Sequence, residues 1–107
     1  MTPATAALFD ALGDPTRRAI VSRIARGPVS VSALATPLGI SLTAVGQHLR
    51  LLEKAGLVLS EKQGRTRSCA LRPEGLRAVE QWAQACRKEW EARLDRLGDL
   101  LDALPDA

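Results

Sequence analysis

Two short helices joined through a glycine constrain the fold of this chain most strongly. Ser32 and Ser41 are placed to cap these helices, because a serine oxygen accepts hydrogen bonds from the unpaired N–H groups at a helix start. Gly39 lies between the helices and permits a left-handed turn, and Gly56 ends the second helix. The second helix is expected to turn one apolar face inward, made of Val45, Leu49 and Leu52. Residues 32–56 are therefore predicted to form a helix-turn-helix.

Two further helices are expected before this unit. Residues 4–12 place apolar side chains at helical spacing, and a glycine stops that helix. Asp14 then offers an N-cap and Pro15 a preorganised first position for a second helix, which is expected to run to Arg26. Residues 29–31 follow as a very short predicted strand. The residues of the second helix expected to point inward are Ala19, Ile20, Ile24 and Ala25.

The hydrophobic period changes after the helix-turn-helix. Residues 57–71 are extended in character and turn at a basic, polar tip, which predicts a β-hairpin. Residues 73–104 carry apolar side chains at steps of three or four, which predicts one long helix with a bend allowed near Gly75. The chain is thus expected to be a single domain over residues 1–107, mainly α with a small β-hairpin wing: a winged helix-turn-helix.

The middle third of the chain is its basic part. The formal net charge of the whole chain is +3, whereas residues 40–72 alone carry +4 and residues 73–107 carry −3. An anionic partner is therefore expected to meet the middle third. The N-terminus does not resemble a secretory signal, and prolines and a glycine interrupt the uncharged run between Gly27 and Leu49. A cytoplasmic location without a membrane partner is expected.

The polar face of the second helix of the helix-turn-helix predicts DNA binding. An α-helix fits the major groove, where Gln pairs with adenine and Arg with guanine or a phosphate. Gln47 and Arg50 stand on this face with Thr43, and Ser41 can offer its hydroxyl to a phosphate. His48, the single histidine, lies at the edge of the buried face. It is equally suited to half-buried packing and to a phosphate contact.

The tip of the predicted hairpin adds a second basic feature. Cations on a mobile turn are suited to follow the phosphate backbone or to enter the minor groove. A plainer explanation exists for each feature: an ordinary solvated helix face, and cations that keep a strand edge soluble. The polar helix face and the basic hairpin tip, found together with a glycine turn, favour DNA binding. The same helix face could instead dock a protein. The wing residues concerned are Lys62, Arg65, Thr66 and Arg67.

Two runs of sequence resemble one family of regulators. Residues 12–20 read LGDPTRRAI and residues 41–58 read SLTAVGQHLRLLEKAGLV. Together, and at this separation, they are similar to the arsenic-repressor (ArsR) family of winged helix-turn-helix regulators, and the similarity extends from about Leu8 to Leu104. The resemblance implies a homodimer whose two recognition helices enter successive major grooves of double-stranded DNA at a near-palindromic operator, usually repressing transcription. By that resemblance the recognition-helix candidates are Ser41, Thr43, Gln47, His48 and Arg50, and residues 62–67 form the wing.

Metal ligands of the family are missing from this sequence. Many members hold thiophilic metals through Cys-x-Cys at the start of the third helix, where this chain has Ser30 and Ser32. Residues 73–107 contain no His, so a zinc site with imidazole ligands cannot form there. No metal or cofactor is therefore expected, and the effector is unknown. With one His and no glycine-rich phosphate loop, the chain is not expected to be an enzyme.

The two cysteines leave two alternatives open. Cys69 falls in the second hairpin strand and Cys86 on the apolar stripe of the last helix. Both positions suit a small buried hydrophobic residue, which is what a free cysteine usually is. The alternative is a thiol-responsive regulator that uses Cys69 and Cys86 as a redox pair, with Arg87 as the neighbour able to lower a thiol pKa.

The last helix is expected to join two subunits. Its apolar stripe is broader than one small domain can cover, although the stripe could instead fold back on its own core. We expect it to pack against the first helix and against the same helix of a second subunit. The residues predicted for this interface are Leu8, Phe9, Leu12, Trp90, Leu94, Leu97, Leu101 and Leu104.

Overall fold

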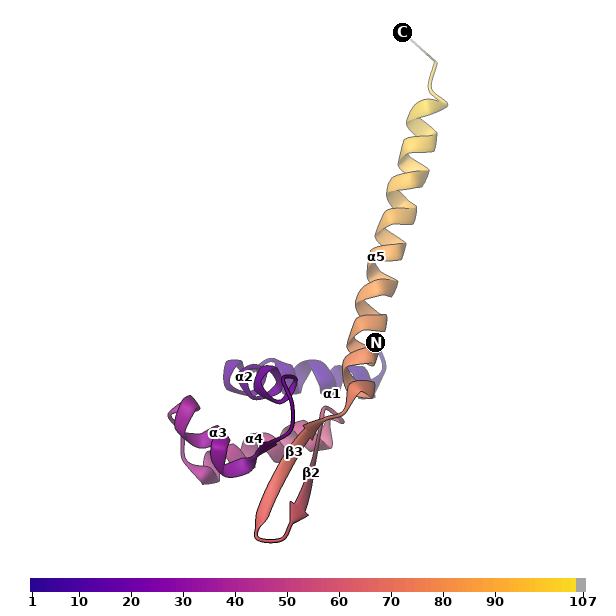
Figure 1. Cartoon of the computed structure of the whole chain (residues 1–107). Coiled ribbons are helices and arrows are strands. Elements are labelled where there is room, and N and C mark those ends of the chain that lie inside the picture. Colours follow the sequence, from indigo (N-terminus) through magenta and orange to yellow (C-terminus); the bar gives the residue numbers. More distant parts are fainter. Residues whose placement is uncertain (106–107) are drawn as a thin grey trace.

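The computed structural model describes residues 1–105 and shows a small body from which one long helix projects (Figure 1). The winged helix-turn-helix predicted from the sequence is confirmed: α3 and α4 form the helix-turn-helix, and β2 and β3 form the wing. The elements in chain order are α1 (Pro3–Leu12), α2 (Pro15–Ile24), β1 (Val29–Ser30), α3 (Val31–Leu38), α4 (Leu42–Lys54), β2 (Val58–Gln63), β3 (Thr66–Leu71) and α5 (Pro73–Asp102).

Side-chain caps set the helix starts, with one change from the prediction. The carboxylate of Asp14 caps α2 and the hydroxyl of Ser41 caps α4, as expected. The cap of α3 was predicted at Ser32, and this is wrong. Ser30 accepts the hydrogen bond from the backbone N–H of Ala33 at 3.3 Å, so the helix begins two residues earlier. Ser30 therefore serves both the end of β1 and the start of α3.

The second helix is shorter than predicted and buries a different set of residues. It ends at Ile24 rather than Arg26, and the backbone N–H of Ala25 closes it on the Val21 carbonyl at 2.9 Å. Val21 is buried whereas Ala25 is exposed, so the predicted inward position of Ala25 is wrong. A φ of 140° at Gly27 then turns the chain into β1, a conformation that favours glycine.

The core lies between the helices and one face of a three-stranded antiparallel sheet of order β1-β3-β2. The register pairs Ser60 with Cys69 and Lys62 with Arg67. The same face of the hairpin therefore packs on the core near its base and carries cations near its tip. The buried core consists of Leu8, Ala11, Ile20, Val21, Ile24, Val29, Leu34, Val45, Leu49, Leu52, Leu57, Val58 and Cys69.

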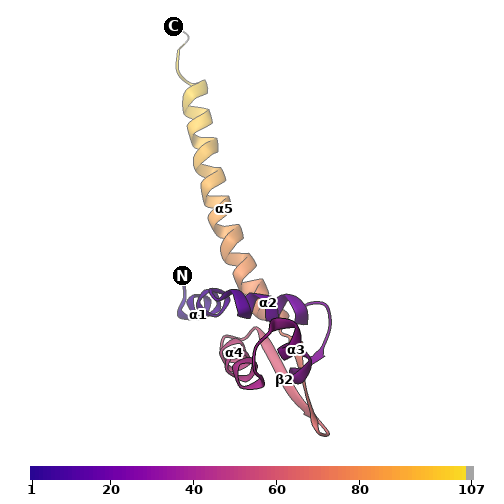
Figure 2. The ribbon, with the colours of Figure 1, turned by 90° about the vertical axis from the view of Figure 1, so that its left-hand side faces the viewer.

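The long helix α5 meets the body only through its first turns. Gly75 is buried because the carbonyl oxygen of Gly56 occupies the space of a side chain: a Cβ on Gly75 would lie 2.6 Å from it. Beyond these turns α5 runs away from the body as one continuous helix without a break at Gly75 (Figure 2), and the longest dimension is 76 Å. Within residues 1–105 no helix is both long and apolar enough to span a membrane.

The two cysteines lie in different environments. Cys69 is buried in the core as predicted, and this burial raises the pKa of its thiol, with the Glu53 charge adding to the effect. Cys86 is exposed on α5 in the single chain, although the sequence suggested a buried position on the apolar stripe. The apolar stripe on which Cys86 lies has no neighbour in the body at that height of the helix.

We expect Gly75→Ala to destabilise the fold. The new methyl group would meet the Gly56 carbonyl oxygen at 2.6 Å and Cδ2 of Leu57 at 3.0 Å, and overpacking of this kind costs roughly 1–3 kcal/mol. Gly98→Ala is the matched control, because nothing lies within 4 Å of its Cβ position and alanine favours a helix by about 1 kcal/mol over glycine. Urea unfolding should move the two variants in opposite directions. A Gly75→Ala protein as stable as the wild type would contradict this packing.

We expect the Cys69 thiol to resist alkylation in the folded protein. It is 0% exposed and its burial disfavours the thiolate, which is the reacting form. Iodoacetamide labelling followed by peptide mass spectrometry should leave Cys69 unmodified until urea unfolds the chain. The same residue in urea is the control for reagent activity, and fast labelling without urea would show that the core opens readily at this strand.

Candidate nucleic-acid interface

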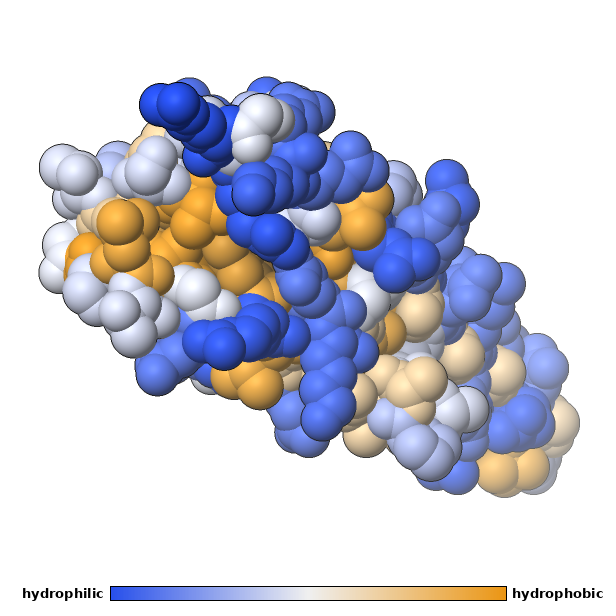
Figure 3. Space-filling model, turned by 90° about the horizontal axis from the view of Figure 1, so that it is seen from below, coloured by the Kyte–Doolittle hydropathy of each residue, from blue (hydrophilic) through white to orange (hydrophobic). Residues whose placement is uncertain are grey.

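The helix α4 exposes a polar face on the side of the molecule where the hairpin projects. Burial of one apolar face fixes the rotation of the helix, so Thr43, Gln47 and Arg50 are exposed together with the cap Ser41. In Figure 1 the lowest parts are α3, α4 and the hairpin tip, and Figure 3 views that side from below. There, hydrophilic side chains project around smaller apolar areas (Figure 3).

Two of these predicted side chains already make local hydrogen bonds. Nε of Arg50 donates to the carbonyl of Gly46 at 3.3 Å, and Oγ of Ser41 accepts from the N–H of Ala44 at 3.1 Å. Nothing lies within 4 Å of a Cβ position on Gly46, so the helix surface is open at this point. Leu42, which was not predicted as a site residue, is 56% exposed at the start of α4. Its place as an apolar residue directly after the cap was the available signal.

The wing carries its cations at and beside the turn. Lys62 pairs with Arg67 across the two strands, and Arg65 follows Gly64 in the turn. A φ of 64° places Gly64 in the left-handed region, which a hairpin turn of this kind requires. The side chains of Lys62, Arg65, Thr66 and Arg67 are all exposed.

A hydrogen-bonded chain that the sequence analysis missed links the wing to α4. Oγ of Ser60 donates to Oε1 of Glu53, and Nε of Arg67 donates to Ser60 Oγ at 3.1 Å. These three residues come from α4, β2 and β3 and line a cavity of about 250 Å³ between the helix and the wing. A signal was available, because the hairpin period puts the polar Ser60 on the inward face opposite Cys69. Arg67 therefore braces the wing as well as contributing charge to it.

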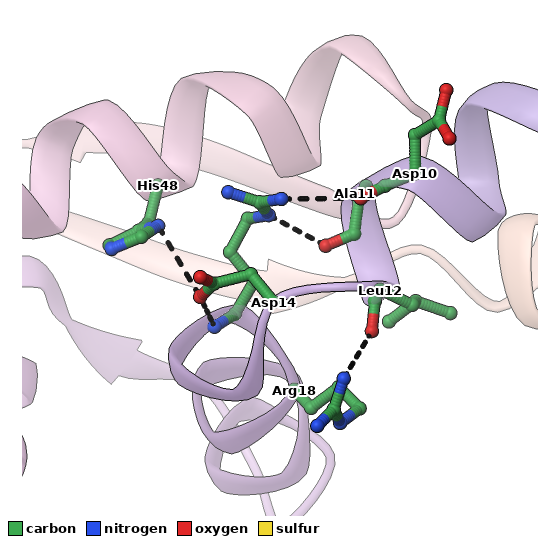
Figure 4. Close-up of polar contacts among 7 residues, drawn as sticks. Asp10, Ala11, Leu12, Asp14, Arg18 and His48 are labelled. Atoms are coloured by element: carbon green, nitrogen blue, oxygen red, sulfur yellow. Dashed lines mark hydrogen bonds and ion pairs between the residues drawn. The ribbon is translucent and has the colours of Figure 1, made fainter.

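The DPTRR run builds the corner between α1 and α2 (Figure 4). Nε of Arg17 donates to the carbonyl of Ala11 at 2.6 Å, and its Nη2 donates to that of Asp10 at 3.2 Å. Nη1 of Arg18 donates to the carbonyl of Leu12 at 2.9 Å. The last carbonyls of a helix have no partner inside the helix, and cationic side chains satisfy them here. These two arginines thus hold the helices together at the corner.

His48 lies against the same corner. Its Nδ1 faces Oδ2 of Asp14 at 4.0 Å (Figure 4), and the histidine side chain is 23% exposed. Hydrogen bonding from the backbone N–H of Arg17 lowers the pKa of Asp14, and the charges of Arg17 and His48 add to this. The side chain of His48 is thus half-buried at this corner, and its contact with a phosphate stays a prediction.

The distal part of α5 presents the apolar stripe predicted for a subunit interface. Trp90 is 62% exposed and Leu97 is 52% exposed, so the stripe does not fold back on its own core. Phe9 of α1 meets Trp82 of α5 edge to face, with ring centroids 4.9 Å apart. Leu8 does not belong to this surface, because it is only 3% exposed inside the core, and Leu12 packs partly buried against the core. Exposed stripe residues are Trp90, Leu94, Leu97, Leu100, Leu101 and Leu104.

The start of α3 holds two serine hydroxyls, at the positions where the family resemblance would place thiolate metal ligands. The oxygens of Ser30 and Ser32 lie 3.4 Å apart. Among residues 1–105, no three His, Cys, Asp or Glu side chains gather as a metal ion would require. That the chain binds no metal stays a prediction from the sequence.

Comparison with known proteins gives a family match over the same region. A family model described as a helix-turn-helix domain matches residues 12–61. Over 71 residues the chain is 48% identical to the HTH-type transcriptional regulator Rv2034 of Mycobacterium tuberculosis, and the match covers 66% of each protein. The chain thus spans just under two thirds of the length of this curated relative.

Solved structures extend the similarity to nearly the whole chain. An ArsR-like transcriptional regulator from Rhodococcus has a TM-score of 0.80 at 32% identity, covering 94% of this chain and 95% of the other. The homodimeric winged helix-turn-helix DNA-binding domain Mb0332 of Mycobacterium bovis, a possible ArsR-family regulator, has a TM-score of 0.65 at 27% identity over 80% of each chain. This chain belongs to the ArsR family of winged helix-turn-helix transcriptional regulators.

Proposed function

We propose that this chain is a sequence-specific DNA-binding regulator that acts as a homodimer on an inverted-repeat operator and represses transcription. The observation that carries the proposal is the exposed polar face of α4 beside a basic wing on one side of the molecule. The acidic part of the chain lies in α5, which projects from the other side of the body. Repression is an expectation that comes from the family resemblance, and the proposal includes no catalytic step.

In this proposal α4 enters the major groove. Gln47 can form paired hydrogen bonds with an adenine edge, which discriminates against a wrong base by about 1–3 kcal/mol. Thr43 stands one turn earlier on the same exposed face, and Leu42 can contact a thymine methyl group. The hydroxyl of Ser41 and the helix start face a backbone phosphate.

The wing supplies contacts that do not depend on sequence. Lys62 and Arg65 neutralise phosphates beside the groove or reach into the minor groove. Arg67 also contributes a positive charge to the wing. Its hydrogen bond to Ser60, which is bonded to Glu53 of α4, holds the wing at a fixed angle to that helix. Because α4 and the wing are braced together, one duplex can meet both.

The dimer doubles these contacts. We infer that the exposed stripe of α5 packs against the same stripe of a second copy, with Phe9 beside it on α1. A two-fold dimer sets the half-sites of an operator about 34–36 Å apart or at a multiple of that distance. The relative Mb0332, described as homodimeric, supports this assembly for the present chain.

Two rival functions receive less support. A protein-docking module would need an acidic partner for the same cations, whereas a duplex accounts for the helix and the wing together. A switch that pairs Cys69 with Cys86 requires the buried thiol of Cys69 to become reactive, and its raised pKa opposes this. We expect a regulator of the proposed kind to act in the cytoplasm.

We expect Gln47→Ala to relax sequence preference and Arg65→Ala to weaken binding to every duplex alike. Loss of one phosphate contact should lower the slope of log K against log salt by about 0.9. Fluorescence anisotropy with a selected operator and with random duplexes, at several salt concentrations, measures both effects. Lys88→Ala, which removes an exposed cation from α5, is the control. If both variants bound the selected operator as the wild type does, the site assignment would be wrong.

We expect Leu97→Glu to dissociate the dimer. A charge on the stripe would lie in the apolar interface without a partner, which is strongly unfavourable. Leu59→Glu is the matched control, because Leu59 on β2 is 46% exposed and Leu97 is 52% exposed. Sedimentation over a range of protein concentrations should give a monomer for Leu97→Glu alone. A stable Leu97→Glu dimer would place the subunit interface elsewhere.

A further inference from the structure

His48 is the one residue of the recognition helix whose polar atom is buried without a hydrogen bond. Among residues 1–105, Nδ1 of His48 has no hydrogen-bond partner and almost no contact with solvent. Leaving such a nitrogen unsatisfied is unfavourable, and native proteins seldom do so. The atom facing it is Oδ2 of Asp14, at 4.0 Å (Figure 4). That separation is too long for a hydrogen bond but within reach of a small movement of α4.

Asp14 is held in place by the corner to which it belongs. Its Oδ2 accepts the backbone N–H of Arg17 at 2.9 Å as the cap of α2. The side chain of Arg17 in turn bonds the last carbonyls of α1, and α1 packs on α5 through Phe9 and Trp82. The carboxylate is therefore a fixed acceptor whose position is set by α1 and α2.

We propose that His48 is a positioning residue: its Nδ1–H pairs with the Asp14 carboxylate and sets how α4 lies against the corner of α1 and α2. The inference rests on the proposed function, since α4 is taken to be the helix that reads DNA. It removes His48 from the set of DNA contacts. It also makes a continuous chain of contacts from α5, through α1, Arg17 and Asp14, to the recognition helix.

Two conservative substitutions separate positioning from a direct DNA contact. In His48→Asn the side-chain amide nitrogen takes the place of Nδ1, whereas in His48→Gln it takes the place of the outer ring nitrogen. Asn should therefore keep operator affinity within about two-fold of the wild type. The variants His48→Gln and His48→Ala should bind the operator about two- to ten-fold more weakly, which is the usual net effect of one hydrogen bond. The probe is a duplex selected by the wild-type protein from a random library.

A double-mutant cycle with Asp14 tests the pairing itself. Asp14→Ser keeps an N-cap for α2, because Ser and Asp cap about equally well, but its hydroxyl is too short to reach His48. If His48 acts through Asp14, the double variant with His48→Ala should lose no more affinity than either single variant, and the salt slope should be unchanged. If His48 contacts a phosphate, the losses should add and the slope should fall by about 0.9.

A measurement without DNA keeps this inference separate from the proposed function. Urea unfolding is measured for the wild type, the two single variants and the double variant. Coupling between His48 and Asp14 should change the equilibrium constant of unfolding by about two- to five-fold, as for partly exposed ion pairs. Absence of coupling there, or rescue by Gln instead of Asn, overturns the positioning role. If the wild-type protein selects no duplex but the coupling is present, the pairing stands and the DNA-binding proposal fails.

Discussion

Burial of Val45, Leu49 and Leu52 in the core holds α4 in one rotation about its axis. Each of these side chains is at most 5% exposed, so turning the helix would bring apolar surface into water. The opposite side of the helix is consequently the exposed one, and it carries Thr43, Gln47 and Arg50. The brace through Glu53, Ser60 and Arg67 then holds the wing beside that side. The proposed reading of a duplex depends on this single packing arrangement.

The order of the elements could be predicted from the sequence because most boundaries carry a local signal, the end of α2 and the start of α3 being the exceptions. Gly39 adopts a φ of 66° at the end of α3, as its place between two apolar runs suggested. Ser41 and Asp14 cap the helices that follow them, because their oxygens reach the unpaired N–H groups of the first turn. The exposed residues of α4 and the wing tip were likewise predictable, since they follow from the helical and strand periods.

Contacts between elements could not be predicted in the same way. Ser30 and Ser32 are equally good caps by residue type, and the pairing of β1 with β3 goes with the choice of Ser30. The place of His48 beside Asp14 depends on how α4 crosses α2, which no local pattern records. The exposure of Cys86 has the same origin, because the helical period shows a stripe but not whether a neighbour covers it.

The helix content of the projecting α5 should depend on protein concentration. All residues from 81 to 97 are exposed in the single chain, so the distal turns are held by their own backbone hydrogen bonds and by exposed ion pairs within the helix, such as Arg87–Glu91. Helical segments without tertiary support are only marginally stable in water. A solitary chain would therefore fray at this end, and ordering of the distal turns would accompany the encounter of two chains. Helix content would then rise with protein concentration, and dilution would lower it again.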